Sequence, residues 1–127
     1  MTADDLDLDL DLGDLRAAFA ADDVLRLILA GSADFNNEVA VRELLAAVDE
    51  RIRRLRAREV VVDLRALDFM NSSCFKQLIS WILAARQHPE EQRYRIRLRV
   101  DPSRYWQKRS LTAISFFGDG IVIVDAG

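Results

Sequence analysis

The chain has too few reactive side chains for most enzyme and metal chemistry. Its 127 residues include one cysteine, Cys74, and one histidine, His88. A single cysteine excludes an internal disulfide, and one cysteine with one histidine does not make a metal-ligand cluster. His88 precedes Pro89 in a polar stretch, which predicts a solvated histidine in a loop. We therefore expect neither a metal nor a cofactor.

Long apolar runs and a basic N-terminus are also missing. No apolar run approaches the roughly 18 residues that a membrane-crossing helix requires. The N-terminus is acidic, whereas a secretory signal begins with basic residues. These absences predict a cytoplasmic protein that does not contact a membrane. With 31% charged and 50% hydrophobic residues, the composition is ordinary for one globular domain.

Negative charge is concentrated at the start of the chain. The first fourteen residues contain six aspartates and neither lysine nor arginine, so the remainder has a slight basic excess. Leucine and aspartate alternate over residues 6–12 as in a strand, but a row of aspartates repels itself without a basic partner strand. We predict a disordered acidic lead over residues 1–13 and a single domain over residues 14–127. As an alternative, the lead lies over a basic surface of its own domain.

Apolar periodicity predicts an α/β domain. Runs at residues 15–20 and 24–30 indicate an N-terminal β-hairpin, and further strands are expected at 60–62, 93–100 and 121–124. Helical patterns at residues 38–56, at 74–87 and after Pro102 fall between them. This order predicts a mixed, mostly parallel five-stranded sheet with three helices. Complete alternation of apolar residues with arginines over residues 93–100 requires an uncovered sheet face, so the helices should lie mainly on one side.

The turn Asn71-Ser72-Ser73 lies between the central strand and the helix that follows it. Each of these side chains can accept a hydrogen bond from the unpaired amides of the first helical turn, so helix capping is the ordinary interpretation. The same amides and the helix dipole also favour a phosphate. A hydroxyl at this position is therefore a candidate charge switch.

Three short segments together resemble the signature of STAS domains, the family that includes bacterial anti-sigma-factor antagonists. They are VVDL at 61–64, LDFM at 67–70 and NSS at 71–73. Gly31, Asp34 and Asn37 also fit the G-x-x-D-x-x-N pattern that commonly follows the second strand of that family. Two positions depart from the family pattern: Asn71 replaces an acidic residue, and Cys74 replaces a glycine.

This resemblance implies a STAS-like domain without the usual C-terminal helix. It also implies a non-enzymatic regulatory module that binds a protein partner of the anti-sigma-type serine kinase class. The phosphate acceptor of such proteins corresponds to Ser73, with Ser72 as second choice. The expected partner-binding residues are Asp34, Asn37, Phe69, Met70, Asn71, Ser72, Ser73 and Lys76.

Several alternatives remain. A constitutive STAS scaffold subunit would keep the fold without a phosphorylation switch. Nucleic-acid or nucleotide binding through the arginine row (Arg93, Arg95, Arg97 and Arg99) is a second alternative, although the row lacks stacking aromatics and suits an acidic protein partner as well. Catalysis is disfavoured because no G-x-S-x-G motif surrounds Ser73. A homodimer is also compatible with the sequence.

Overall fold

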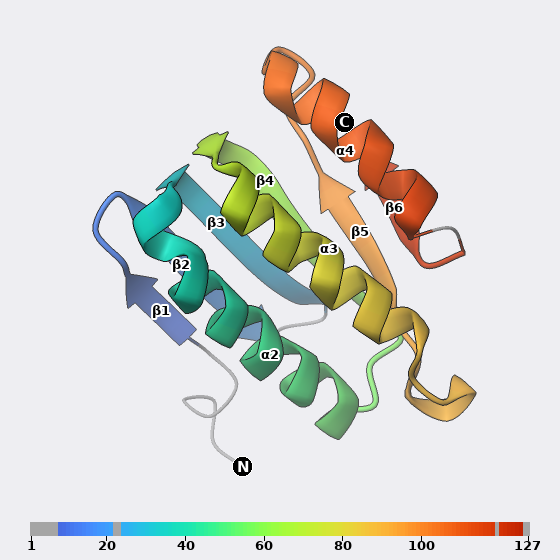
Figure 1. Ribbon diagram of the computed structural model, residues 1–127. Helices are drawn as coiled ribbons and strands as arrows, with labels where there is room; N and C mark the ends of the chain where they lie inside the picture. Colours follow the sequence, from blue (N-terminus) through green and yellow to red (C-terminus); the bar gives the residue numbers. More distant parts are fainter. Residues whose placement is uncertain (1–7, 22–23, 119, 126–127) are drawn as a thin grey trace.

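The chain folds around a six-stranded sheet whose strands lie side by side in sequence order (Figure 1). The computed structural model describes residues 8–21, 24–118 and 120–125. The strands are β1 (Leu8–Asp11), β2 (Leu15–Ala21), β3 (Leu25–Ala33), β4 (Glu59–Met70), β5 (Arg95–Arg99) and β6 (Val122–Asp125). β1 to β3 pair antiparallel, and β3 to β6 pair in parallel. The predicted mixed, mostly parallel sheet with an N-terminal hairpin is confirmed.

Three α-helices connect the parallel strands and lie on one face of the sheet (Figure 1). α2 (Glu38–Arg54) follows β3, α3 (Ser72–Arg86) follows β4, and α4 (Tyr105–Phe117) follows β5. The short 3-10 turns η1 (Phe35–Asn37) and η2 (Glu90–Gln92) precede α2 and β5. Apolar residues recur at helical spacing on the sheet-facing side of α3, where Cys74, Leu78, Trp81, Ile82 and Ala85 are buried.

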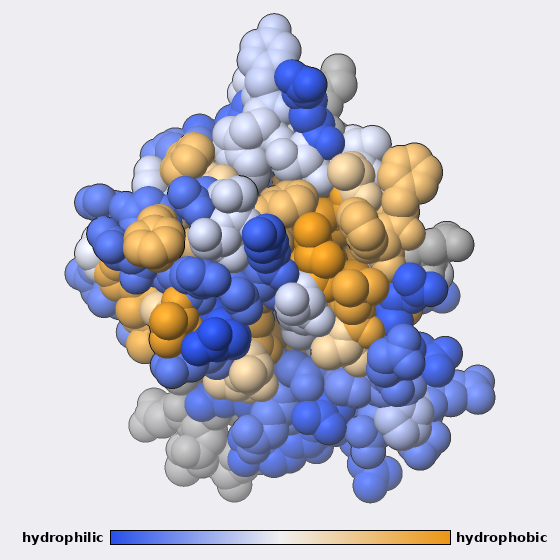
Figure 2. All heavy atoms as spheres, viewed as in Figure 1, coloured by the Kyte–Doolittle hydropathy of each residue, from blue (hydrophilic) through white to orange (hydrophobic). Residues whose placement is uncertain are grey.

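The helix-covered face of the molecule has a mixed surface. Seen from the side of the helices, much of it is hydrophilic, while hydrophobic side chains gather beside α3, on the side that faces α4 (Figure 2). Leu83 of α3 and Phe117 of α4 are both exposed apolar residues.

The predicted open face of the sheet is confirmed by β5 and its flanking residues. Tyr94, Ile96, Leu98 and Val100 are at most 5% exposed, whereas the four arginines that alternate with them are more exposed. Val61 of β4 points to the open face and is still only 6% exposed. Arg26 and Arg97 lie beside it in register, and the long stems of arginines can cover an apolar neighbour.

The sheet has one strand more than the five predicted. β1 falls inside the range assigned to the acidic lead, and it pairs with β2 so that Asp11 lies opposite Arg16. A strand here was not predicted because no basic partner strand was expected beside the aspartates, and Arg16 of β2 is such a partner for Asp11. Leu10 and Leu12 pack against the core, which adds apolar burial to this pairing. Residues 1–7, the rest of the predicted lead, lie outside the described residues.

Gly31 allows the chain to approach itself closely near the end of β3. Its φ is +91°, and a Cβ atom there would lie 2.0 Å from the backbone oxygen of Asp14. The next residue, Ser32, donates its backbone N–H to that same oxygen at 2.9 Å. The register between β3 and β4 also shifts between Gly31 and Ser32. Glycine at this position therefore fixes how the last residues of β3 reach the end of β4.

Candidate functional site

Two segments predicted to bind a partner meet at one end of the sheet. β3 and β4 are parallel, and their last residues, Ala33 and Met70, lie opposite each other. The backbone N–H of Asn71 donates to the oxygen of Ala33 at 2.7 Å. As a result, the structure brings η1, the end of β4 and the first turn of α3 to one place. All eight predicted partner-binding residues lie in or beside these three segments.

Asn71 is the residue that caps α3. Its backbone is extended (φ −65°, ψ 153°), and its side-chain oxygen accepts the N–H of Ser73 at 2.7 Å. The two serines are therefore not needed as caps. Ser72 is exposed and Ser73 is half-buried in the first helical turn. Among the described residues, neither hydroxyl has a hydrogen-bond partner.

η1 is held by a capping box formed by Asp34 and Asn37. The Asp34 side chain accepts the N–H of Asn36 at 2.9 Å, and the Asn37 side-chain oxygen accepts the N–H of Asp34 at 2.9 Å. The Asn37 amide nitrogen donates to the Leu12 carbonyl at 3.0 Å. Asn37 is 6% exposed. Its side chain therefore joins η1 to the connection between β1 and β2, which is a positioning role.

Cys74 joins α3 to the same loop. Its thiol is fully buried and donates to the backbone oxygen of Asp34 at 3.2 Å. Burial raises the pKa of this thiol, and the nearby charges of Asp34 and Glu38 raise it further. A buried thiol with a raised pKa is a poor nucleophile. Cys74 is therefore a packed core thiol of α3.

Exposed apolar side chains occur in the segments that meet at this end of the sheet. Phe69 is 48% exposed at the end of β4, Phe35 is 67% exposed in η1, and Val39 is 51% exposed at the start of α2. Lys76 is exposed one turn after Ser72, whereas Met70 is buried. Phe35 and Val39 were not predicted from the sequence. The signal that could have found them is a large apolar residue, Phe35, inside an otherwise polar turn.

The arginine row is not a continuous positive surface. Arg97 lies 3.4 Å from Glu59 and 3.9 Å from Asp125. In register, Arg99 has Asp63 on one side and Asp125 on the other. Strand pairing thus places carboxylates on both sides of these two arginines. This arrangement weakens the alternative of nucleic-acid binding, because fewer positive charges are left for a phosphate backbone.

Asp63 is a buried carboxylate of the open face. It accepts two bonds from the Arg65 guanidinium, at 3.0 and 2.8 Å, and one from the Arg65 backbone N–H at 3.1 Å. The side-chain bonds are the main cause that holds the pKa of Asp63 below its usual value, against the opposing effect of burial. Asp63 lies within β4 and is paired with Arg65, which gives this carboxylate a structural role.

His88 is not the solvated loop histidine predicted from the sequence. Its ring Nε2 lies 2.8 Å from an Asp49 carboxylate oxygen, and its side chain is 16% exposed. The Tyr94 hydroxyl donates to the same carboxylate and accepts the indole N–H of Trp81 at 2.9 Å. Burial is the main cause that raises the pKa of Tyr94. The prediction failed because Asp49 is far from His88 in sequence.

The described residues contain no group of three His, Cys, Asp or Glu side chains placed to hold a metal. None of the described helices is both long and apolar enough to cross a membrane.

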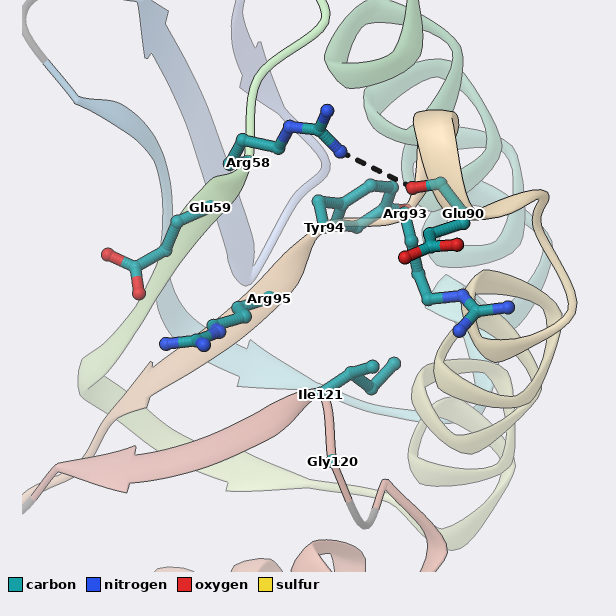
Figure 3. A pocket seen from close by; sticks show the side chains of 8 residues that line it. All are labelled: Arg58, Glu59, Glu90, Arg93, Tyr94, Arg95, Gly120 and Ile121. Carbon is teal, nitrogen blue, oxygen red and sulfur yellow. Dashed lines mark hydrogen bonds between the residues drawn. The ribbon is translucent and has the colours of Figure 1, made fainter.

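A cavity of about 490 Å³ lies at the opposite end of the sheet from Ser73. It is formed where β4, β5 and β6 begin, and arginines from two segments surround it (Figure 3).

No protein-family model and no curated protein matches the chain. A mostly parallel sheet that begins with a hairpin and carries three helices on one face is a STAS-like α/β fold, as the sequence predicted. A crystal structure of an anti-sigma factor antagonist from Mycobacterium paratuberculosis is similar to it with a TM-score of 0.59. The similarity covers 97% of this chain and 90% of that chain at 17% sequence identity. It establishes the fold.

Proposed function

We propose that this chain is a non-enzymatic regulatory module that binds a protein partner at the end of the sheet where β3 and β4 finish. One observation carries the proposal: two serine hydroxyls without partners among the described residues lie in the first turn of α3, beside exposed apolar side chains. Exposed apolar groups next to polar ones are typical of protein-binding surfaces. The fold shared with an anti-sigma factor antagonist points to the same class of activity.

Phosphorylation of Ser73 is the proposed switch. A phosphate adds about −1.5 to −2 charges at neutral pH, and the amides of a first helical turn stabilise such a charge. Lys76 lies three residues after Ser73, a spacing that places two side chains on neighbouring parts of a helix face. The fold would therefore tolerate the phosphate. A partner that contacts a neutral hydroxyl would not, and we expect its affinity to fall. The proposed partner is a serine kinase of the anti-sigma type.

The test compares partner binding by variants of the two serines. The partner is captured from cells with the wild-type chain and identified by intact mass, and its affinity is then measured with purified protein. Ser73→Asp should bind at least about tenfold more weakly than wild type, a loss of about 1.4 kcal/mol. Ser73→Ala and the control Ser72→Ala should bind normally. If Ser73→Asp binds as tightly as wild type and cell-derived protein carries no phosphate, the chain is a constitutive scaffold subunit.

The surface itself is tested with an exposed aromatic residue at each end of the molecule. Phe69→Ser should weaken partner binding, because an aromatic side chain at the centre of an interface contributes much of its affinity. Phe116 is 79% exposed near the end of α4, so Phe116→Ser is the matched control. Equal losses from both variants would contradict a partner site at the end of β4.

A further inference from the structure

Three arginines surround the cavity at the start of β4 and β5, and all three are free of carboxylate partners among the described residues. Arg58 precedes β4, Arg93 lies two residues before β5, and Arg95 is the first residue of β5. The ion pairs of the described residues involve other arginines, such as Arg65 and Arg97. Figure 3 shows the side chains of Arg58, Arg93 and Arg95 arranged around the hollow.

Backbone contacts hold these arginines without neutralising them. Arg58 Nη1 donates to the carbonyl oxygen of Glu90 at 3.3 Å, and Arg93 Nε donates to that of His88 at 3.2 Å. Each guanidinium has five N–H donors, so most of them remain for a ligand. The Arg95 N–H donates to the Arg58 carbonyl at 2.8 Å, which ties the two segments together.

The carboxylates of the cavity do not balance this positive charge. Glu59 is 3.4 Å from Arg97 and lies opposite Arg95 in register, and Figure 3 shows the Glu59 carboxylate and the Arg95 guanidinium on the same side of the hollow. Glu90 also lines the cavity, and its carboxylate can accept hydrogen bonds from hydroxyl groups. Ile121 and the ring of Tyr94 give the cavity an apolar wall. Three guanidiniums and two carboxylates line the cavity, so its net charge is positive.

We propose that this cavity binds a small phosphorylated molecule through its phosphate group. Guanidinium groups bind phosphate in a bidentate manner and are favoured where phosphate is recognised. A volume of about 490 Å³ falls within the range of small-molecule sites and exceeds the space that one phosphate fills. The remaining space, between Glu90 and Ile121, suits a hydroxyl-bearing organic body. Tyr94 lines the cavity but is only 2% exposed, so its ring offers no open face for stacking the bases of a nucleic-acid chain.

The ligand would join three segments that are distant in sequence. Arg58 ends the connection between α2 and β4, Arg93 follows η2, and Gly120 lies between α4 and β6. Gly120 has a φ of +91°, and a Cβ atom added there would meet no atom of the described residues within 4 Å, so this side of the cavity is open to a ligand. Binding would stabilise the starts of β4, β5 and β6 together.

The experiment measures binding of inorganic pyrophosphate and of glycerol phosphate by calorimetry and by thermal unfolding, at low ionic strength. At ten times its Kd, the ligand should raise the melting temperature by about 5 °C. Arg58→Gln and Arg93→Gln should each weaken binding at least about tenfold without lowering the melting temperature of the free protein. Arg54→Gln is the matched control, because Arg54 is an exposed arginine outside the cavity. Glycerol serves as the unphosphorylated probe.

Three results would overturn the proposal. The first is the absence of binding at millimolar pyrophosphate. In the second, Arg54→Gln weakens binding as much as the cavity variants, which would mean non-specific charge attraction. In the third, a single-stranded oligonucleotide binds more tightly than either small probe, so that the surface serves a nucleic acid instead. Partner binding is measured in a separate experiment with variants of Ser73 and Phe69. A negative result for phosphate binding would therefore not contradict the proposed function.

Discussion

Replacement of Asn71 by alanine should destabilise the protein by about 1 kcal/mol. Its side-chain oxygen accepts the Ser73 N–H at 2.7 Å, and alanine leaves that amide without its cap. Loss of an N-cap side chain costs roughly 0.5–2 kcal/mol. The backbone bond from Asn71 to Ala33 does not depend on the side chain, so the cost should stay near the middle of this range.

The expected change is large enough to measure by two methods. At about 2.1 cal/mol/K per residue, unfolding entropy for this chain is roughly 0.27 kcal/mol/K, so 1 kcal/mol lowers the melting temperature by about 4 °C. Urea unfolding should show a lower midpoint with an unchanged slope, because the exposed surface does not change.

The controls separate the cap from the hydroxyls that follow it. Ser72→Ala and Ser73→Ala should change the melting temperature by less than about 2 °C, because surface substitutions outside special features are close to neutral. Asn71→Asp should match or exceed wild type, since a carboxylate caps equally well and favours the helix dipole. An Asn71→Ala variant that melts like wild type, or a serine variant that loses as much stability, would refute the capping role of Asn71.

Four further substitutions test other parts of the structure. Gly31→Ala should cost roughly 2–4 kcal/mol from backbone strain and overlap, whereas Gly13→Ala, with positive φ but open space, should cost about 1–2 kcal/mol in the same urea titration. Tyr94→Phe should cost about 1–3 kcal/mol, because the hydroxyl both donates and accepts a buried hydrogen bond. The lowered pKa of Asp63 stabilises the fold above the unfolded pKa near 4, and this contribution disappears as pH falls through the lower folded pKa. Asp63→Asn should therefore lower stability at pH 7 by less than about 1 kcal/mol and flatten the acid side of the stability profile, which unchanged acid unfolding would contradict.

Local patterns predicted most of the fold. Alternation over residues 93–100 was enough to infer an open sheet face, because the two sides of a strand differ at every residue. β1 was missed since its pairing depends on a residue of another strand: Asp11 is tolerated because Arg16 lies opposite it. A pattern within one segment does not contain that information.

The candidate site was predicted in its position and less well in its details. The turn after β4 and the loop after β3 were both identified, and parallel pairing brings them together. Contacts between distant segments decide which polar side chains are buried and which of them cap a helix. Asn37 bonds to Leu12, and His88 lies against Asp49. Neither partner is indicated by the sequence near the asparagine or the histidine.

The order of the strands in the sheet bears on how the chain folds while it is being synthesised. Each strand from β2 to β6 pairs with the strand that precedes it in the sequence. A ribosome adds roughly 5–20 residues each second, so β1 to β4 emerge roughly 3–11 s before β6 is finished. Each new strand therefore pairs with the exposed edge of the strand made just before it. No strand has to insert between two strands that are already paired. A circular permutant beginning at α3 would make β5 and β6 first, and although these pair with each other, β5 would have to wait for β4, the last strand to be made.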